Sequence, residues 1–196
     1  LEQPDKARGA FLKVLGIRPK HSNANLQLAR IAVAKRQGAK ALGHLGRLGA
    51  SEQKDPAVRL LRAEALHMAG RQREAMTALE ELDRGAPADP KVAFTVGMTL
   101  LSWGEHAKAE AAFSRALERE PSNLEILYSQ GVAALRGGKL ERAQSVLETV
   151  LKSNPNDAGA LQQLAKVHIQ RGENERAILL LLEARKLAPA RPDILL

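Results

Sequence analysis

Apolar and polar residues follow one another along the chain with the period of an α-helix, in segments of about 14 residues. In each segment the apolar side chains recur three and four positions apart, which places them on one helix face. The segments come in pairs joined by short turns, and none shows the strict alternation of a β-strand. The pattern therefore predicts an all-α protein built from pairs of amphipathic helices.

The helix pairs repeat at a fixed interval of 34 residues. Alanines keep this interval at Ala7, Ala41, Ala75, Ala109, Ala143 and Ala177. A larger apolar residue follows each alanine after four positions, at Phe11, Leu45, Leu79, Phe113, Leu147 and Leu181. Glycines of the turns keep the interval at Gly70, Gly104, Gly138 and Gly172, and prolines at Pro19, Pro87, Pro121, Pro155 and Pro189, with Gln53 in the missing place. The chain is thus predicted to be an array of one structural unit.

A residue suited to the N-cap of a helix stands before most of the first helices. These residues are Asp55, Asp89, Asn123 and Asp157. For residues 124–157 the pattern predicts a first helix over 124–136, a turn at Gly137 and Gly138, and a second helix over 140–153. Small residues such as Gly97 and Gly131 would let the paired helices approach closely.

The period and the order of small and large residues resemble those of the tetratricopeptide repeat. The resemblance is clearest over 90–123, at Val96, Gly97, Leu100, Gly104, Ala109, Phe113, Ala116, Leu117 and Pro121. It implies a right-handed superhelical solenoid of antiparallel helix pairs. The first helix of each pair would line an inner concave wall.

The resemblance covers nearly the whole chain, so residues 1–196 are predicted to form a single array. Residues 4–21 would be the trailing second helix of a truncated repeat, and residues 192–196 the start of a further helix. Five full repeats are expected, over 22–55, 56–89, 90–123, 124–157 and 158–191. We expect the first two to be the less stable, because Asn25 and Arg59 stand where the family has a large apolar residue. The absence of an initiator Met and of a signal peptide indicates a fragment of a longer chain.

The resemblance also implies a ligand groove on the first helices. Carried over position by position, its residues are Arg30, Leu60, Glu64, His67, Lys91, Phe94, Met98, Tyr128, Val132, Arg136, Gln162 and Lys166. The middle of this wall would be an apolar stripe, which suits an amphipathic helix or an extended peptide with apolar anchors. The stripe consists of Leu60, Phe94, Met98, Tyr128 and Val132. Two alternatives stay open: Phe94 and Tyr128 pack only between helices, or the protein's own segments or a second copy fill the groove.

Positive charge is concentrated near the start of the chain. The net charge is +8, from 30 Lys and Arg against 22 Asp and Glu. The first fifty residues hold ten of the basic residues and only Glu2 and Asp5 as acids. A basic end can attract nucleic acid or another polyanion. No nucleic-acid motif accompanies the charge, however, and solvated helix faces are the simpler interpretation.

Composition and motifs exclude several kinds of chemistry. The chain has no cysteine, hence no disulfide and no thiolate site. Its five histidines lack metal-ligand spacing, and no phosphate-binding loop or nucleophile elbow occurs. His168 is expected in the core, and His67 is expected to form a surface hydrogen bond with Glu64. We therefore expect no catalytic residue, no metal, no cofactor and no enzyme activity in this chain.

The leading functional hypothesis is a protein-protein interaction scaffold that holds a peptide or helix of a partner in its concave groove. One alternative is a targeting or regulatory appendage of an enzyme in the parent chain. Another is contact with anions or nucleic acid through the basic N-terminal quarter, although nucleic acid is not the partner we expect. Exposed ends of a truncated array would also allow self-association. The composition is that of a soluble protein without a membrane span and does not indicate a compartment.

Overall fold

The structure is a computed structural model that describes residues 2–85 and 89–189. Over these residues the ordered elements are α-helices and one short 3₁₀ helix, and no strand occurs among them. The predicted all-α fold class is therefore confirmed. The expected helix start at 192–196 and the repeat proline Pro87 lie outside the described residues.

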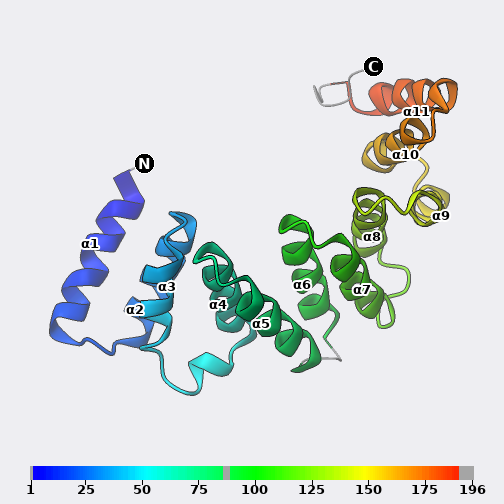
Figure 1. Cartoon of the computed structure of the whole chain (residues 1–196). Helices are drawn as coiled ribbons and strands as arrows, with labels where there is room; N and C mark the ends of the chain where they lie inside the picture. The colour runs from blue at the N-terminus through cyan, green and yellow to red at the C-terminus, as the bar shows by residue number, and fades with distance from the viewer. Residues whose placement is uncertain (1, 86–88, 190–196) are drawn as a thin grey trace. The chain divides into compact units, whose positions relative to one another are not determined.

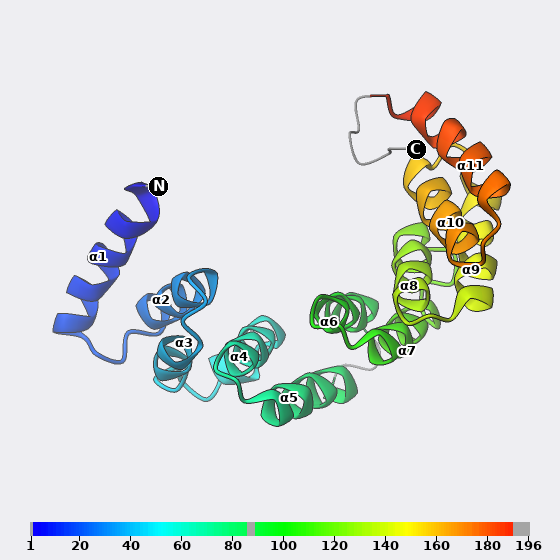
Figure 2. The same ribbon diagram turned by 45° about the horizontal axis from the view of Figure 1, so that its top comes forward.

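The chain forms two compact units, residues 1–85 and residues 86–196. The N-terminal unit contains α1 (Glu2–Ile17), α2 (Ser22–Ala34), α3 (Gly38–Leu45), the 3₁₀ helix η1 (Glu52–Lys54), α4 (Pro56–Met68) and α5 (Gln72–Gly85). The C-terminal unit contains α6 (Pro90–Ser102), α7 (His106–Leu117), α8 (Leu124–Arg136), α9 (Leu140–Ser153), α10 (Ala158–Gln170) and α11 (Asn174–Leu187). Within each unit, every helix packs against the next one in chain order (Figures 1 and 2). The bounds predicted for 124–136 and 140–153 are those of α8 and α9.

The N-caps expected from the repeat form in the structure. Side-chain caps are made by Asp55, Asp89, Asn123 and Asp157. The Asp157 carboxylate, for example, accepts a hydrogen bond from the Ala160 N–H at 2.9 Å. His21 stands one repeat before Asp55 and caps α2 in the same way, because its Nδ1 accepts from the Ala24 N–H at 3.2 Å. The sequence pattern did not identify His21 as a cap, since histidine is not a favoured N-cap residue.

Glycines allow the paired helices to come close together. A Cβ built on Gly97 of α6 would lie 2.6 Å from Cε1 of Phe113 on α7. One repeat later, a Cβ on Gly131 of α8 would lie 2.9 Å from the side chain of Leu147 on α9. Because real Cβ atoms do not approach other atoms so closely, a larger residue at either position would push the pair apart. Phe113 and Leu147 are fully buried as a result.

The turns inside the helix pairs use a left-handed backbone conformation at one fixed position. Four glycines occupy it with φ between 74° and 81°, at Gly70, Gly104, Gly138 and Gly172. The equivalent residue of the first pair is Arg36, whose φ is 56°. A residue with a Cβ costs about 1 kcal/mol in this conformation, whereas glycine adopts it freely. The first repeat therefore folds with a small strain that the later repeats avoid.

The end of the first repeat departs from the others. Helix α3 has 8 residues, whereas α5 has 14. After Leu45 the chain enters a turn and then η1, where Gln53 replaces the repeat proline. The Gln53 Nε2 donates a hydrogen bond to the Leu48 carbonyl at 2.9 Å and closes this turn.

Asn25 of α2 is fully buried and hydrogen-bonded on both sides of its amide. Its Nδ2 donates to the carbonyls of Pro19 and His21 at 3.0 and 3.2 Å. Its Oδ1 lies 3.1 Å from Nδ1 of His44 on α3, which therefore donates. The polar residue that breaks the apolar pattern of the first repeat is thus fully satisfied.

Two further buried polar residues join elements of the C-terminal unit. The Gln130 Nε2 of α8 donates to Oγ of Ser114 on α7 at 2.8 Å. His168 of α10 is buried, as expected, and its Nδ1 lies 2.9 Å from an Oε2 of Glu173 in the following turn. Both bonds fix one helix against the element beside it.

Candidate functional site

The C-terminal unit carries a pocket on the first helices of its pairs. It is lined by Met98, Leu101 and Ser102 of α6, by Tyr128, Ser129, Val132 and Arg136 of α8, and by Gln163 of α10. Its volume is about 280 Å³. Apolar side chains form half of the lining, and hydroxyl, amide and guanidinium groups form the rest. We call this feature the groove pocket, because the resemblance assigns the first helices to the ligand groove.

Tyr128 is positioned by packing against a buried cluster and against α10. Its ring lies against the buried cluster that includes Leu135 of α8 and Leu164 of α10. Its hydroxyl is 3.5 Å from the place where Gly159 would carry a Cβ. Since Gly159 has no side chain, the ring fits beside the first turn of α10. Tyr128 is half-buried, so it both packs between helices and lines the pocket.

The other lining residues combine apolar surface with hydrogen-bonding groups. Met98 is 43% exposed, whereas Val132 beside it is buried. The Ser129 hydroxyl donates to the Glu125 carbonyl at 2.8 Å. Its oxygen therefore keeps lone pairs with which it can accept a further bond. Arg136 is exposed at the end of α8 and supplies a positive charge.

The remaining groove residues predicted for this unit lie outside the pocket lining. The Phe94 ring is half-buried and packs on Phe113, with the ring centroids 5.8 Å apart. Gln162 is buried on α10, and its neighbour Gln163 lines the pocket instead. Lys91 and Lys166 are exposed. Sequence reasoning missed Gln163, because the family position carried over points one residue earlier.

Four predicted groove residues belong to the N-terminal unit. Arg30 is exposed on α2, and Leu60, Glu64 and His67 are half-buried on α4. Burial raises the pKa of the Glu64 carboxyl above its ordinary value. Because Leu60 and Phe94 belong to different units, their place in one continuous apolar stripe stays a prediction.

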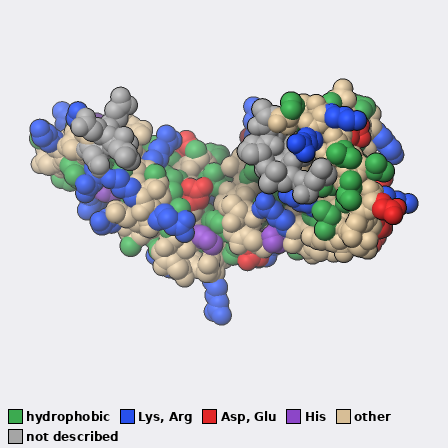
Figure 3. Space-filling view, turned by 90° about the horizontal axis from the view of Figure 1, so that it is seen from above, with side chains coloured by type: hydrophobic (Ala, Val, Ile, Leu, Met, Phe, Trp, Pro, Cys, Tyr) green, Lys and Arg blue, Asp and Glu red, His purple; other side chains and the backbone are tan. Residues whose placement is uncertain are grey.

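The N-terminal unit has a second pocket that the sequence did not predict. Its lining is Arg8 and Leu12 of α1, Leu28, Ile31 and Ala32 of α2, Lys35 and Gln37 of the turn that follows α2, and Lys40 and His44 of α3. The volume is about 270 Å³. Lys and Arg side chains are numerous on the surface of this part of the chain (Figure 3). We call this feature the basic pocket. The only signal in the sequence was the excess of basic residues in the first fifty, which does not say which of them meet.

The described residues offer little for other kinds of chemistry. None of their His, Asp and Glu side chains gather in a group of three or more that could hold a metal ion. None of the helices in the described part of the chain is long and apolar enough to cross a membrane.

The stacked helix pairs, with a pocket on their first helices, define a helical-repeat protein. A sequence profile of the tetratricopeptide repeat matches residues 1–65, 100–161 and 134–195, which together span most of the chain. The chain therefore belongs to the tetratricopeptide-repeat family. No significant relative is found among curated proteins.

Solved structures with the same fold include several proteins of low sequence identity. MamA from Desulfovibrio magneticus RS-1 is 16% identical, with a TM-score of 0.66 over 87% of this chain and 97% of its own. MamA of strain MSR-1 is 21% identical, with a TM-score of 0.62 over 85% of this chain and 95% of its own. YrrB, described as a TPR protein with an unusual peptide-binding site, is 18% identical, with a TM-score of 0.60 over 93% of this chain and 94% of its own. These likenesses show a common fold.

Proposed function

We propose that this chain is a protein-interaction scaffold whose groove pocket binds a helix or an extended peptide of a partner protein. The observation that carries the proposal is a hollow of about 280 Å³, half of whose lining residues are apolar, in which Met98 stays 43% exposed. A flexible methionine beside the Tyr128 ring can adapt its shape to an apolar side chain of a ligand. The pocket has room for one such anchor.

The polar groups of the pocket favour a peptide over a purely apolar ligand. Ser129 can accept a hydrogen bond from a peptide N–H, and the Gln163 amide can bond to a peptide carbonyl or N–H. Arg136 would pair with an acidic side chain next to the anchor. A peptide that binds here is expected to combine one large apolar residue with a nearby acid.

We also infer that the chain acts by binding and not by catalysis. Several of its histidines and carboxylates serve caps, turns and helix contacts, such as the His21 cap and the bond between His168 and Glu173. The peptide-binding site named for YrrB gives a precedent for this fold. A role as targeting appendage of an enzyme in a longer parent chain would use the same groove pocket.

The proposal is tested with peptides selected from a displayed random library against the full chain. Affinities of the selected peptides are then measured by calorimetry for the wild type and for Met98→Glu combined with Arg136→Glu. Both side chains are exposed, so the variant is expected to fold. We expect this variant to bind the peptides at least about tenfold more weakly. The two glutamates remove the apolar contact of Met98 and the ion pair of Arg136 with an acidic residue of the peptide.

The matched control is Ile17→Glu combined with Arg18→Glu, on exposed positions at the end of α1. This variant makes the same charge changes away from the groove pocket, and we expect wild-type affinity. Equal affinity of the selected peptides for the wild type and for the Met98 and Arg136 variant would show that the groove pocket is not the binding surface.

Helix α11 supports a second proposal, which concerns self-association. Its exposed apolar residues include Ile178, Leu179 and Leu182. One repeat earlier the same positions are polar, at Gln144, Ser145 and Glu148 of α9. On α9, the Gln144 side chain accepts a hydrogen bond from Arg171 of the next repeat. On α11, the equivalent residue is Ile178, which cannot form such a bond. An apolar face at positions that are otherwise polar is typical of an interface.

We propose that this face pairs with the same face of a second copy. Glu175 and Arg185 stand at equal distances on either side of Leu180, on the stripe that holds Ile178 and Leu182. An antiparallel pair of α11 helices would therefore place each Glu175 opposite an Arg185 of the other copy. Sedimentation velocity should show a dimer for the wild type and a monomer for Leu182→Glu. A monomeric wild type at high concentration would contradict this pairing.

A further inference from the structure

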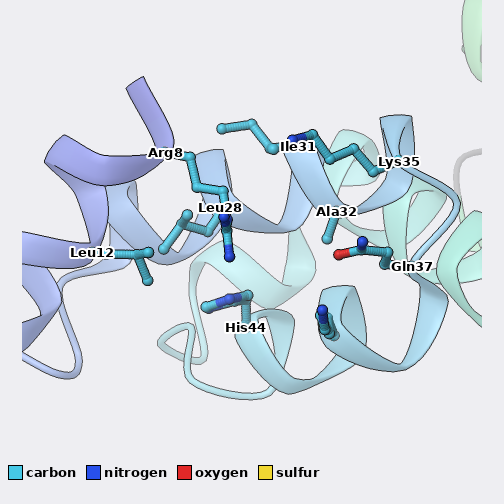
Figure 4. A pocket seen from close by; sticks show the side chains of 9 residues that line it. Arg8, Leu12, Leu28, Ile31, Ala32, Lys35, Gln37 and His44 are labelled. Carbon is cyan, nitrogen blue, oxygen red and sulfur yellow. The ribbon is translucent and has the colours of Figure 1, made fainter. Parts of the chain in front are cut away.

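The basic pocket brings together side chains from three helices of the N-terminal unit. Arg8 comes from α1, Lys35 from the C-cap of α2, and Lys40 and His44 from α3. Figure 4 shows the Arg8 side chain directed from α1 toward the His44 ring across the pocket. Arg8 is far in sequence from Lys35 and Lys40 and meets them only because α1 folds against the following helices.

Apolar side chains form the rest of the lining. They are Leu12 of α1 and Leu28, Ile31 and Ala32 of α2. Leu12 is 44% exposed even though it stands on a helix that is packed against α2. Among the described residues that line the pocket, none is acidic. The pocket is therefore an apolar hollow of about 270 Å³ with positive charge around it.

The basic pocket lies on a different side of α2 from the predicted groove. Successive residues of a helix are rotated by about 100° around its axis. Leu28 and Ala32 are each two positions from Arg30, the groove residue predicted for this helix, and so point to the opposite side. The basic pocket is thus a second site, independent of the groove pocket proposed above.

The lining disfavours nucleic acid as the ligand. Proteins that bind single strands stack bases on aromatic rings, and Phe11, the one Phe, Tyr or Trp of α1 to α3, packs against the core cluster of Leu15, Ala24 and Leu28. A phosphate backbone would also leave the apolar residues Leu12 and Ile31 without a partner. The charges surround one hollow of side-chain size, which fits an apolar anchor with acids beside it.

We propose that the basic pocket binds an acidic segment of a partner protein, with one leucine or phenylalanine side chain in the hollow and flanking carboxylates on Arg8, Lys35 and Lys40. Arginine and lysine pair with carboxylates in charge-assisted hydrogen bonds. The charge of the first fifty residues, ten bases against two acids, would draw such a segment toward this part of the chain.

The test uses the full chain and a panel of fluorescein-labelled peptides, read by fluorescence anisotropy. Each peptide carries a leucine or a phenylalanine flanked by glutamates at varied spacing. Two matched sets replace either the apolar residue by serine or the glutamates by glutamine. We expect members of the first set to bind and both matched sets to bind about tenfold more weakly or not at all.

Variants of the chain locate the site. Arg8→Glu combined with Lys40→Glu should weaken binding about tenfold or more. Lys13→Glu combined with Lys20→Glu changes the net charge equally at exposed positions outside the pocket, and should weaken it much less. Leu12→Ser should also weaken binding, whereas Ile17→Ser, at an 83% exposed position of the same helix, should not.

Several outcomes would overturn the proposal. One is that no peptide of the panel binds. A second is an equal loss in both charge-reversal variants, which would show attraction by net charge alone. A third is that the serine set binds as well as the first set. The last is binding to phosphatidylserine vesicles or to single-stranded RNA in place of the peptides, with the same dependence on Arg8 and Lys40.

Discussion

Asn25 shows, at the scale of single residues, how a polar side chain can stabilise a helical repeat from within. Its amide joins the loop before α2, through Pro19 and His21, to His44 on α3. The family pattern has a large apolar residue at this position, and the sequence therefore indicated a weak point. The structure instead shows a buried polar group with a partner for both its donor and its acceptor, which is the condition for burying it at low cost.

Replacement of Asn25 by leucine is therefore predicted to destabilise the chain, although it restores the apolar pattern. Asn25→Leu leaves two backbone carbonyls and the His44 ring without their buried partner, at a cost of about 1–3 kcal/mol. Urea unfolding of the full chain measures the change. Asn23→Leu, at an exposed position of the same helix, is the control and should change stability by less than about 0.5 kcal/mol. A stabilised Asn25→Leu variant would show that the apolar pattern matters more than the amide.

His44 gives a prediction for pH. Burial, assisted by the charge of Arg47, lowers the pKa of His44 below its ordinary value of 6.5. As the pH falls below 6.5, the unfolded chain takes up a proton at this histidine while the folded chain does not, so the folded state loses stability. The loss should be complete once the pH is below the lowered pKa of the folded state.

The measurement compares the free energy of unfolding of the wild type and of His44→Gln at pH 7 and pH 5. Glutamine can still donate to Asn25 but does not titrate in this range. We expect the wild type to lose more stability than the variant over this interval. Equal losses would show that His44 does not contribute to the pH dependence.

At the scale of helix pairs, close packing depends on a glycine facing a large residue. Gly97→Ala would place a methyl group against the buried Phe113 ring, and overpacking of this kind costs about 1–3 kcal/mol. Gly43→Ala in α3 meets no atom within 4 Å and should stabilise the chain by up to about 1 kcal/mol through helix propensity. Thermal unfolding of both variants checks the contrast, and a neutral Gly97→Ala would contradict the packing argument.

The helix pairs could be predicted from sequence where a residue type has one dominant use. Asp and Asn before a helix gave the N-caps, and repeated glycines gave the turns with positive φ. The same reasoning missed His21 and Arg36, which take these two roles with residue types that do not favour them. In these cases the neighbouring repeat positions and the tertiary contacts decide the conformation, and local propensity does not.

At the scale of the whole molecule, the fold was predictable because one pattern recurs along most of the chain. The two pockets could be predicted less completely from the sequence. The family position placed Phe94 in the groove, and this stays a prediction; the structure adds that the half-buried ring packs on Phe113, a contact that the sequence did not indicate. The basic pocket combines Arg8 of α1, Lys35 at the C-cap of α2 and Lys40 of α3. A count of charges locates such residues along the chain, but only the packing of the helices shows which of them share a pocket.

The central claim is that the groove pocket holds the apolar anchor of a bound peptide. The chain has three methionines, Met68, Met76 and Met98, and only Met98 lines the groove pocket. The most direct measurement is methyl NMR of the chain labelled with carbon-13 at its methionine methyl groups, during titration with a selected peptide. The account predicts that the Met98 signal shifts in proportion to binding while the Met68 and Met76 signals do not. A peptide that binds and leaves the Met98 signal unmoved would contradict it.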